Sequence, residues 1–498
     1  MAASLEADVK RVRVSALVAL VSALVIPLRG QSQAPAVQPP ASSPGRSTAL
    51  GWIDTNASTL KTVNQRIWSY AEVGLAEVKS SRELITLLKS NGFEVQEGVA
   101  GMPTAFVASY GKGKPVIGIL AEYDALPGLS QEAAPERKAR AGADAGHGCG
   151  HSIFGTASTG AAIAIKQAIA AGQATGTIRL YGTPAEETGI GKTYMLREGL
   201  FKDADVVLTW HASDKTAAGY DYSKANVSVK FHFSGLPAHA SVSPHEGRSA
   251  LDAVELMDAG VNFMREHIKS DARIHYVITN GGGQPNVVPP EAEVWYYIRA
   301  DKHTDVERYY AWVQDIAKGA AMMTHTTLSS MKVDADMHEV LPNRALSELI
   351  HHNLEAVGAP RFTDEDKAFA RATQAALGRT FDQALSERVE PLPDRPEQGL
   401  ASTDVGDISW QVPVGSLVAA SYTYGAPGHS WQIVACTGGR IGETGMLVAA
   451  KALAGTAIDL LSTPALVERA RADFTAIRSP LAYVTFIPEG QKAPAAIR

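Results

Sequence analysis

Apolar and polar positions follow two patterns along the chain. Runs that are apolar almost throughout, at residues 115–123, 176–182 and 204–210, are typical of strands buried in a sheet. Helical stretches such as residues 155–172 lie between them, and a strand at 416–425 and a helix at 441–461 follow near the C-terminus. This alternation predicts an α/β domain with an open sheet.

A different pattern occupies residues 223–334. Strict alternation and amphipathic stretches predict the order strand, helix, strand, strand, helix, strand, at residues 227–235, 249–268, 272–280, 291–300, 305–323 and 326–335. This order is that of a small ferredoxin-like α+β unit. We therefore expect a unit inserted at 223–334 into a larger domain made of residues 51–222 and 335–462, with a tail at 463–498 to which we assign no function.

The N-terminal residues have the features of a secretory signal. Lys10, Arg11 and Arg13 precede an apolar run at 14–27, which is shorter than the roughly 20 residues that span a bilayer. A segment rich in Pro, Ser and Gln follows. We predict a signal peptide at 1–34, a linker at 35–50 and a periplasmic or secreted protein; the alternative is an uncleaved membrane anchor.

Composition narrows the partners. The net charge is −6 and 45% of the residues are hydrophobic, as in ordinary globular proteins. Without a basic excess, no nucleic-acid partner is expected. No segment after the signal is expected to cross a membrane. We therefore expect no membrane association once the signal peptide is cleaved.

The two cysteines are Cys149 and Cys436. One disulfide between them is possible in an exported protein. However, the stretch GHGCGHS places Cys149 between His147 and His151, which favours a metal site. In an extended segment, alternate side chains point to the same side, so these residues could converge on one ion.

Further metal-binding residue types occur where predicted strands end. Each alone fits a structural or solvated role, but the carboxyl ends of strands gather at one edge of an open sheet. The residues of these types are Glu186 and Glu187 after residues 176–182, His211 after 204–210, and His429 after 416–425. Adjacent residues point in different directions, so one glutamate can bind metal while the other acts as a general base; a solvated acidic turn is the alternative.

Seven motifs resemble one family. In chain order they are AEYDALPG, GHGCGHS, TPAEETGIGKTYM, LTWH, SGLPAHAS, STDVGDISW and GAPGHSW. Together they resemble the dinuclear metallopeptidases of family twenty, in the amidohydrolase branch with p-aminobenzoyl-glutamate hydrolases and aminoacyl-dipeptidase-like proteins. The resemblance covers about residues 51–462 and implies a zinc-peptidase-like catalytic domain with an inserted lid or dimerisation domain.

The resemblance also implies roles for single residues. Glu186 matches the general base, and Asp124 matches a catalytic residue, although Glu122 stands where other branches have a metal-binding histidine. His147 has no matching ligand role. The ligands for two divalent ions, Zn or Mn, match Cys149, His151, Glu187, His211 and His429.

Three residues of the inserted unit match the family's lid. His239 matches a histidine that reaches across a homodimer to polarise the scissile carbonyl. Asn286 and Arg299 match residues that hold oxygens of the substrate, and Arg suits a carboxylate because it can bind it bidentately. Arg299 fits equally well as a surface charge at a strand end.

The implied reaction is hydrolysis of an amide in an N-acyl- or aminoacyl-amino acid that retains a free carboxylate. A metal-bound hydroxide would attack, with a glutamate as the base. Candidate substrates resemble p-aminobenzoyl-glutamate or dipeptides. The alternatives are a non-catalytic binding protein on the same scaffold and an exopeptidase acting on longer peptides.

Overall fold

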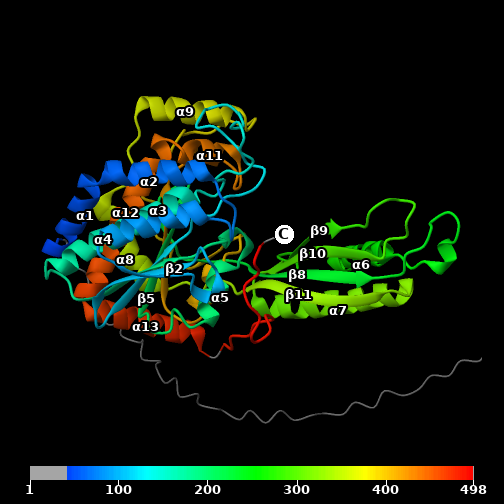
Figure 1. Ribbon diagram of the computed structural model, residues 1–498. Coiled ribbons are helices and arrows are strands. Elements are labelled where there is room, and N and C mark those ends of the chain that lie inside the picture. The colour runs from blue at the N-terminus through cyan, green and yellow to red at the C-terminus, as the bar shows by residue number, and fades with distance from the viewer. Residues whose placement is uncertain (1–41, 480, 497–498) are drawn as a thin grey trace, which may run out of the picture. The chain divides into compact units, whose positions relative to one another are not determined.

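The computed structural model describes residues 42–479 and 481–496 (Figure 1). The signal peptide expected at 1–34 lies outside these residues. Helix α1 (Pro44–Thr55) begins inside the range expected to be a linker. The Ser43 hydroxyl caps it by accepting the Arg46 N–H, and Ala49 and Ile53 are fully buried. Residues 44–50 are therefore part of the folded core.

A seven-stranded sheet has the order β1-β2-β4-β3-β5-β13-β6. The four strands β4, β3, β5 and β13 are parallel, whereas β1, β2 and β6 at the two edges run antiparallel to their neighbours. The strands are β1 (Glu94–Glu97), β2 (Phe106–Lys112), β3 (Val116–Ala121), β4 (Gly176–Gly182), β5 (Val206–Ser213), β6 (Ala217–Ala218) and β13 (Val414–Ala420). The α/β prediction is confirmed, with β13 lying earlier than the expected 416–425.

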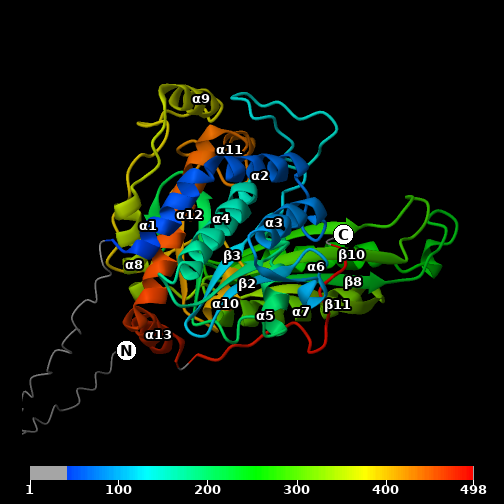
Figure 2. The same cartoon turned by 60° about the vertical axis from the view of Figure 1, so that its left-hand side comes forward.

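Two long apolar helices, α4 (His151–Ala170) and α12 (Arg440–Ser462), pack on each other and on the central strands (Figure 2). At Gly155 a Cβ atom would lie 2.6 Å from the Glu122 carbonyl oxygen, so glycine allows α4 to lie close to the end of β3. Among the described residues, α12 is the one helix long and apolar enough to cross a membrane. Most of it is buried in the protein, as in a core helix.

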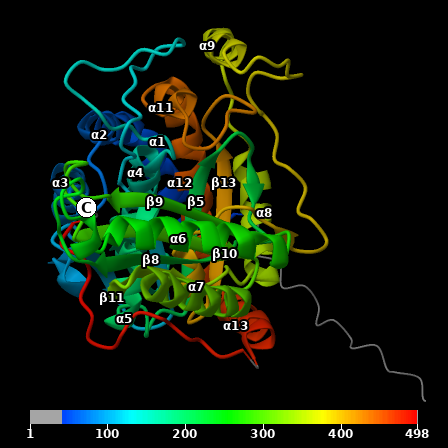
Figure 3. The same cartoon turned by 90° about the vertical axis from the view of Figure 1, so that its right-hand side faces the viewer.

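The second sheet has four antiparallel strands in the order β11-β8-β10-β9. Its elements are β8 (Ala225–Ser234), α6 (Ala250–Met264), β9 (Arg273–Asn280), β10 (Glu291–Ala300), α7 (His303–Thr324) and β11 (Thr327–Met337). Helices α6 and α7 cover one face of it (Figure 3). Element order and strand order are those of a ferredoxin-like fold, as the sequence predicts. We call this part the four-stranded unit.

The remaining elements surround the seven-stranded sheet or connect its parts. Strands β7 (Asp221–Tyr222) and β12 (Glu397–Gln398) form a two-stranded ribbon. The helices are α2 (Ala57–Tyr70), α3 (Val78–Ser90), α5 (Gly191–Arg197), α8 (Arg344–Val357), α9 (Asp364–Ala375), α10 (Val405–Ser409), α11 (Trp431–Thr437) and α13 (Pro464–Arg478).

Candidate active site

The Cys-x-His segment is a turn rather than the extended stretch that the sequence suggested. Gly150 between the two ligand types has a φ of 85°, in the left-handed region that favours glycine, and His151 is already the first residue of α4. A Cβ atom at Gly150 would also lie 2.6 Å from the Ala212 side chain. Cys149 and His151 therefore converge through a tight turn into a helix, not through strand alternation.

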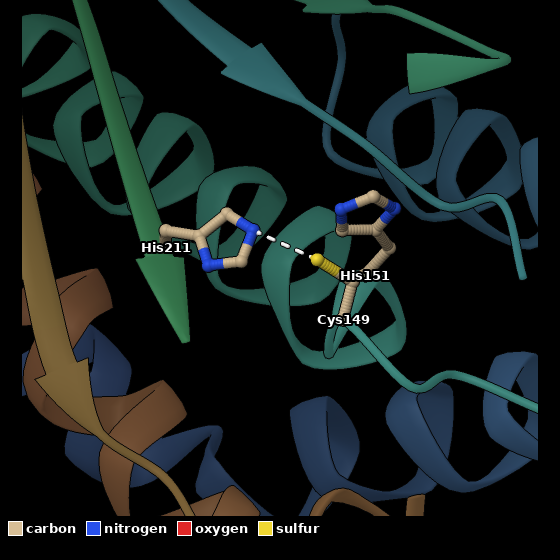
Figure 4. Close-up of side chains that lie close together, drawn as sticks. All are labelled: Cys149, His151 and His211. Carbon is tan, nitrogen blue, oxygen red and sulfur yellow. Dashed lines mark hydrogen bonds between the residues drawn. The ribbon is translucent and has the colours of Figure 1, made fainter. Parts of the chain in front are cut away.

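His211 meets this turn from β5. Its Nε2 lies 3.4 Å from the Cys149 Sγ, and His151 stands on the other side of the sulfur (Figure 4). The His211 Nδ1 is 2.8 Å from the Ala212 carbonyl oxygen, which leaves Nε2 as the ring atom that faces the cysteine. The sequence placed His211 just after its strand, whereas β5 continues to Ser213. Both cysteines are free, so no disulfide competes for Cys149.

His151 is held by Asp124 at the end of β3. The His151 Nδ1 lies 2.8 Å from Asp124 Oδ1, while Asp124 Oδ2 accepts the Glu187 N–H at 3.0 Å. The side chains of Asp124 and His151 are both buried. Asp124 thus orients one histidine and the backbone of the neighbouring glutamate, in the manner of a carboxylate that supports a metal ligand.

Glu186 and Glu187 follow β4 on a strained turn. Ala185 before them has a φ of 55°, and its N–H donates to the buried Glu77 carboxylate at 2.8 Å. The two glutamates then diverge. Glu187 Oε2 lies 3.3 Å from the His429 Nε2, and Glu186 Oε2 lies 3.9 Å from the His151 Nε2.

A buried ion pair that the sequence analysis missed adjoins these glutamates. The Lys192 ammonium lies 2.8 Å from Glu122 Oε1 and 2.6 Å from Asp404 Oδ1, and all three side chains are buried. Burial lowers the Lys192 pKa, but the two carboxylates outweigh it and hold the pKa well above its usual value. Lys192 and Asp404 lie inside TPAEETGIGKTYM and STDVGDISW, so the motifs contained the signal.

Charge also tunes the groups that face the cavity. Burial by itself raises the Cys149 pKa, but the charges and hydrogen bonds of the neighbouring His211 and His151 together outweigh it. The Cys149 pKa therefore lies well below its usual value. Burial, followed by the Cys149 charge, raises the Glu187 pKa to about 7. Burial lowers the pKa of His147 to about 4, and its Nε2 lies 3.2 Å from the Ile67 carbonyl oxygen, away from the cluster.

The donor atoms form three overlapping groups in which all ligand atoms lie within 4.8 Å of one another. The groups are Cys149, His151 and His211; Cys149, Glu187 and His429; and Glu122, His151 and Glu186. Three of their buried atoms, His151 Nε2, Glu122 Oε2 and Glu187 Oε1, have no hydrogen-bond partner among the described residues, although the first two lie 3.2 Å apart as an ion pair. Such atoms are costly unless they bind something, and a mixed Cys, His and Glu set fits divalent transition metals.

A cavity of about 470 Å³ opens beside the cluster. Glu186, Glu187 and His429 line it from one side, and Arg299 of the four-stranded unit lines it from the other. Neither His239 nor Asn286 is among the described residues that line it. Both are exposed in two loops of the four-stranded unit, joined by the Ala240 N–H, which donates to the Asn286 carbonyl oxygen at 3.0 Å. A single chain thus brings together all five expected metal ligands, the base and Arg299, but not these two residues.

Comparison with known proteins supports this description. The family described as peptidase family M20/M25/M40 matches residues 118–457. A p-aminobenzoyl-glutamate hydrolase chain of Escherichia coli is 40% identical over 88% of this chain and 96% of its own length. Xaa-Arg dipeptidase of Mus musculus is 29% identical over 85% of this chain and 90% of its own.

Solved structures agree on the fold. A dinuclear metal binding peptidase of the M20 family from Bacillus subtilis superimposes with a TM-score of 0.54, at 17% identity, over 82% of this chain and 99% of its own. The match to residues 118–457 covers the strand ends that carry the clustered ligands. The chain therefore belongs to peptidase family M20/M25/M40 and is a metallo-amidohydrolase of that family.

Proposed function

We propose that this chain hydrolyses the amide bond of N-acyl- or aminoacyl-amino acids of the p-aminobenzoyl-glutamate or dipeptide class. One observation carries the proposal: buried ligand atoms of His151, Glu122 and Glu187, which make no hydrogen bond among the described residues, converge beside Glu186 at the wall of a cavity. The relative named as a p-aminobenzoyl-glutamate hydrolase, at 40% identity, supports the aryl-glutamate end of this range. The relative named Xaa-Arg dipeptidase supports the dipeptide end.

The proposed cofactor is a pair of divalent cations, Zn or Mn, held by Cys149, His151, Glu187, His211 and His429. When bound, such ions polarise a substrate carbonyl and lower the pKa of water toward neutrality. Cys149 and His151 each belong to two of the three ligand groups, so both would hold a metal at this site. The thiolate favours Zn, whereas the histidines and carboxylates suit either metal.

Glu186 is the proposed general base. It lines the cavity, its Oε2 lies 3.9 Å from the His151 Nε2, and burial together with the Glu122 charge raises its pKa well above the usual value. A carboxylate with a raised pKa is suited to take a proton from the attacking water and pass it to the departing nitrogen. Lys192 and Asp124 then act as positioning residues, for Glu122 and His151 respectively.

The proposed assembly is a homodimer formed through the four-stranded unit. Strand β9 is an edge strand, and it exposes Tyr276, Val277 and Ile278 by 37, 50 and 39%. An apolar edge strand is a template for pairing with a second chain. In the dimer, His239 and Asn286 of each copy would complete the site of the partner copy. A charged Val277→Lys variant should dissociate the dimer in analytical ultracentrifugation, and a variant that stays dimeric would rule out this interface.

Export is likewise a proposal, and it rests on the basic residues and apolar run within residues 1–34. Fractionation of a bacterial host should place the full chain in the periplasm and a variant lacking residues 1–34 in the cytoplasm. Full-length protein in the membrane fraction would favour the uncleaved anchor instead.

The deciding experiment combines metal analysis with a substrate series. About two metal ions per chain are expected, with hydrolysis of p-aminobenzoyl-glutamate or a dipeptide that stops on chelation and returns with Zn or Mn. Turnover that rises with peptide length would favour the exopeptidase alternative. Metal-loaded protein that binds these amides without cleaving any of them would favour the non-catalytic alternative.

A further inference from the structure

The four-stranded unit presents a polar pair to the cavity. Asn226 on β8 and Arg299 on β10 are direct cross-strand partners, and both line the cavity. Their neighbours Val227 and Ile298 point to the opposite face, where α6 and α7 cover the apolar core. Asn226 and Arg299 therefore share the face that lies toward the proposed ligands and base, which we call the catalytic cluster: Cys149, His151, Glu186, Glu187, His211 and His429.

The side chain of Asn226 is buried but makes no hydrogen bond in the described part of the chain. Its side chain is 0% exposed, and neither Oδ1 nor Nδ2 has a hydrogen-bond partner among the described residues. The Arg299 Nε is buried and unpartnered in the same way. By contrast, Ser228, two residues further along the same face, accepts the Trp295 Nε1–H at 2.8 Å. Burying a carboxamide whose oxygen and nitrogen both lack hydrogen bonds lowers the stability of the fold, and no hydrogen bond within the fold offsets this loss.

The surroundings indicate what this pair binds. The described residues that line the cavity include one Arg and no Lys, so Arg299 is their one permanent cation. It interacts with the charge of Glu186, which places the guanidinium within electrostatic range of the proposed base. A carboxylate that pairs with Arg299 would therefore lie near the bond under attack.

We infer that Asn226 recognises the amino-acid half of the substrate, with Oδ1 accepting the scissile amide N–H and Nδ2 donating to the α-carboxylate beside Arg299. A carboxamide offers one acceptor and one donor side by side, and the N–H and carboxylate of an acylated amino acid offer the complementary pair on one Cα. The substrate class is then narrowed to secondary amides of α-amino acids. This inference rests on the proposed function.

The test uses two substrates and two variants of the metal-loaded full chain. The substrates are p-aminobenzoyl-glutamate and its ester analogue, in which oxygen replaces the amide N–H. Asn226→Leu removes both contacts. Asn226→Asp keeps an acceptor for the N–H but loses the donor and repels the carboxylate. Asn353→Leu is the control, because Asn353 is equally buried but bonds to Leu349 and Asp459 and does not line the cavity.

The two variants should separate the two contacts. For Asn226→Leu, kcat/KM for the amide should fall about 30- to 100-fold. The fall in kcat/KM for the ester should be about tenfold smaller, because the ester has no N–H to make the contact. For Asn226→Asp, KM should rise at least about tenfold for both substrates, with their ratio unchanged. The unfolding midpoint of Asn226→Leu should stay level or rise, because two unpaired polar atoms are removed, whereas that of Asn353→Leu should fall.

Equal losses for amide and ester in Asn226→Leu would overturn the N–H contact. An unchanged KM in Asn226→Asp would overturn the carboxylate contact. Failure of the proposed function gives a different result: the metal-loaded wild type would cleave neither p-aminobenzoyl-glutamate nor any dipeptide, and the inference would fall with it.

Discussion

Two largely buried clusters in this protein use the same residue types in different ways. The first is the catalytic cluster at the ends of the parallel strands. The second, which we call the junction cluster, comprises His303, Asp336, His338, Asp407 and Tyr483. It lies where the four-stranded unit, α10 and the C-terminal tail meet.

The histidines of the junction cluster are each paired with a carboxylate. His303 Nε2 lies 2.8 Å from Asp336 Oδ1, and His338 Nδ1 lies 2.9 Å from Asp407 Oδ1. The two rings stack with centroids 3.8 Å apart. The tail closes the cluster, because the Tyr483 hydroxyl donates to Asp407 at 3.2 Å.

The two clusters differ in whether their buried polar atoms are hydrogen-bonded or are directed at a cavity. In the catalytic cluster, several buried ligand atoms make no hydrogen bond among the described residues and converge beside a cavity. In the junction cluster, His338 Nε2 is the one ring nitrogen without a partner in the described part of the chain, and no described metal-ligand group includes the cluster. Residue type alone therefore does not distinguish a reactive cluster from a structural one; unsatisfied atoms that point at shared space do.

The largest expected effect tests the reactive cluster. Glu186→Gln should lower kcat about 10³- to 10⁴-fold, because the amide cannot accept the water proton, while metal content stays at the wild-type value. Activity assays beside metal analysis measure both, with the exposed Glu198→Gln as the control. Loss of metal together with activity would instead make Glu186 a ligand.

Removal of a proposed ligand comes next. Cys149→Ala should weaken metal binding by at least about 100-fold, more than the loss of a supporting residue would. The matched control is Cys436→Ala, since Cys436 is also a free cysteine but belongs to no metal-ligand group of the described residues. A competition titration with a chromophoric chelator measures the affinity. Equal metal affinity in the two variants would remove Cys149 from the site.

The junction cluster should respond in stability rather than in chemistry. Asp407→Ala leaves the donors of His338, Thr193 and Tyr483 without their acceptor, and should lower the free energy of unfolding by about 2 kcal/mol. Metal content per folded chain should not change. Urea unfolding checks the first point, and the exposed Asp315→Ala should stay within about 0.5 kcal/mol of wild type. Metal loss in Asp407→Ala would contradict the separation of the two clusters.

The smallest effect is a pH dependence. Burial lowers the His303 pKa, but the hydrogen bond and charge of Asp336 outweigh it, so the pKa is raised above its usual value. A raised histidine pKa means that the folded state binds the proton more tightly. Its contribution is therefore complete below about pH 6.5 and is lost as the pH rises through the higher folded pKa.

Wild type should accordingly be more stable relative to His303→Gln at pH 5.5 than at pH 8.5. Urea unfolding of both proteins across this range measures the difference. A constant gap would show that His303 does not titrate with folding.

Local pattern predicted much of the architecture. The apolar and alternating runs gave β10 with its observed bounds Glu291–Ala300 and α12 to within one residue at each end, and the element order gave the ferredoxin-like unit. The residues expected where strands end, Glu186, Glu187, His211 and His429, also lie together at the edge of the sheet. These features depend on which face of a local element is apolar, and that information is contiguous in the chain.

Tertiary structure alone decided which of these residues would be reactive. The turn at Gly150 and the strained Ala185 set where Cys149 and Glu186 point, and these backbone angles are held by packing. The ion pair of Lys192 with Asp404 joins residues 212 positions apart. Asn226 is an ordinary strand residue in the sequence, and it becomes distinctive only because its side chain makes no hydrogen bond in the described fold. Whether a polar atom is satisfied depends on neighbours brought together through space, which no local pattern encodes.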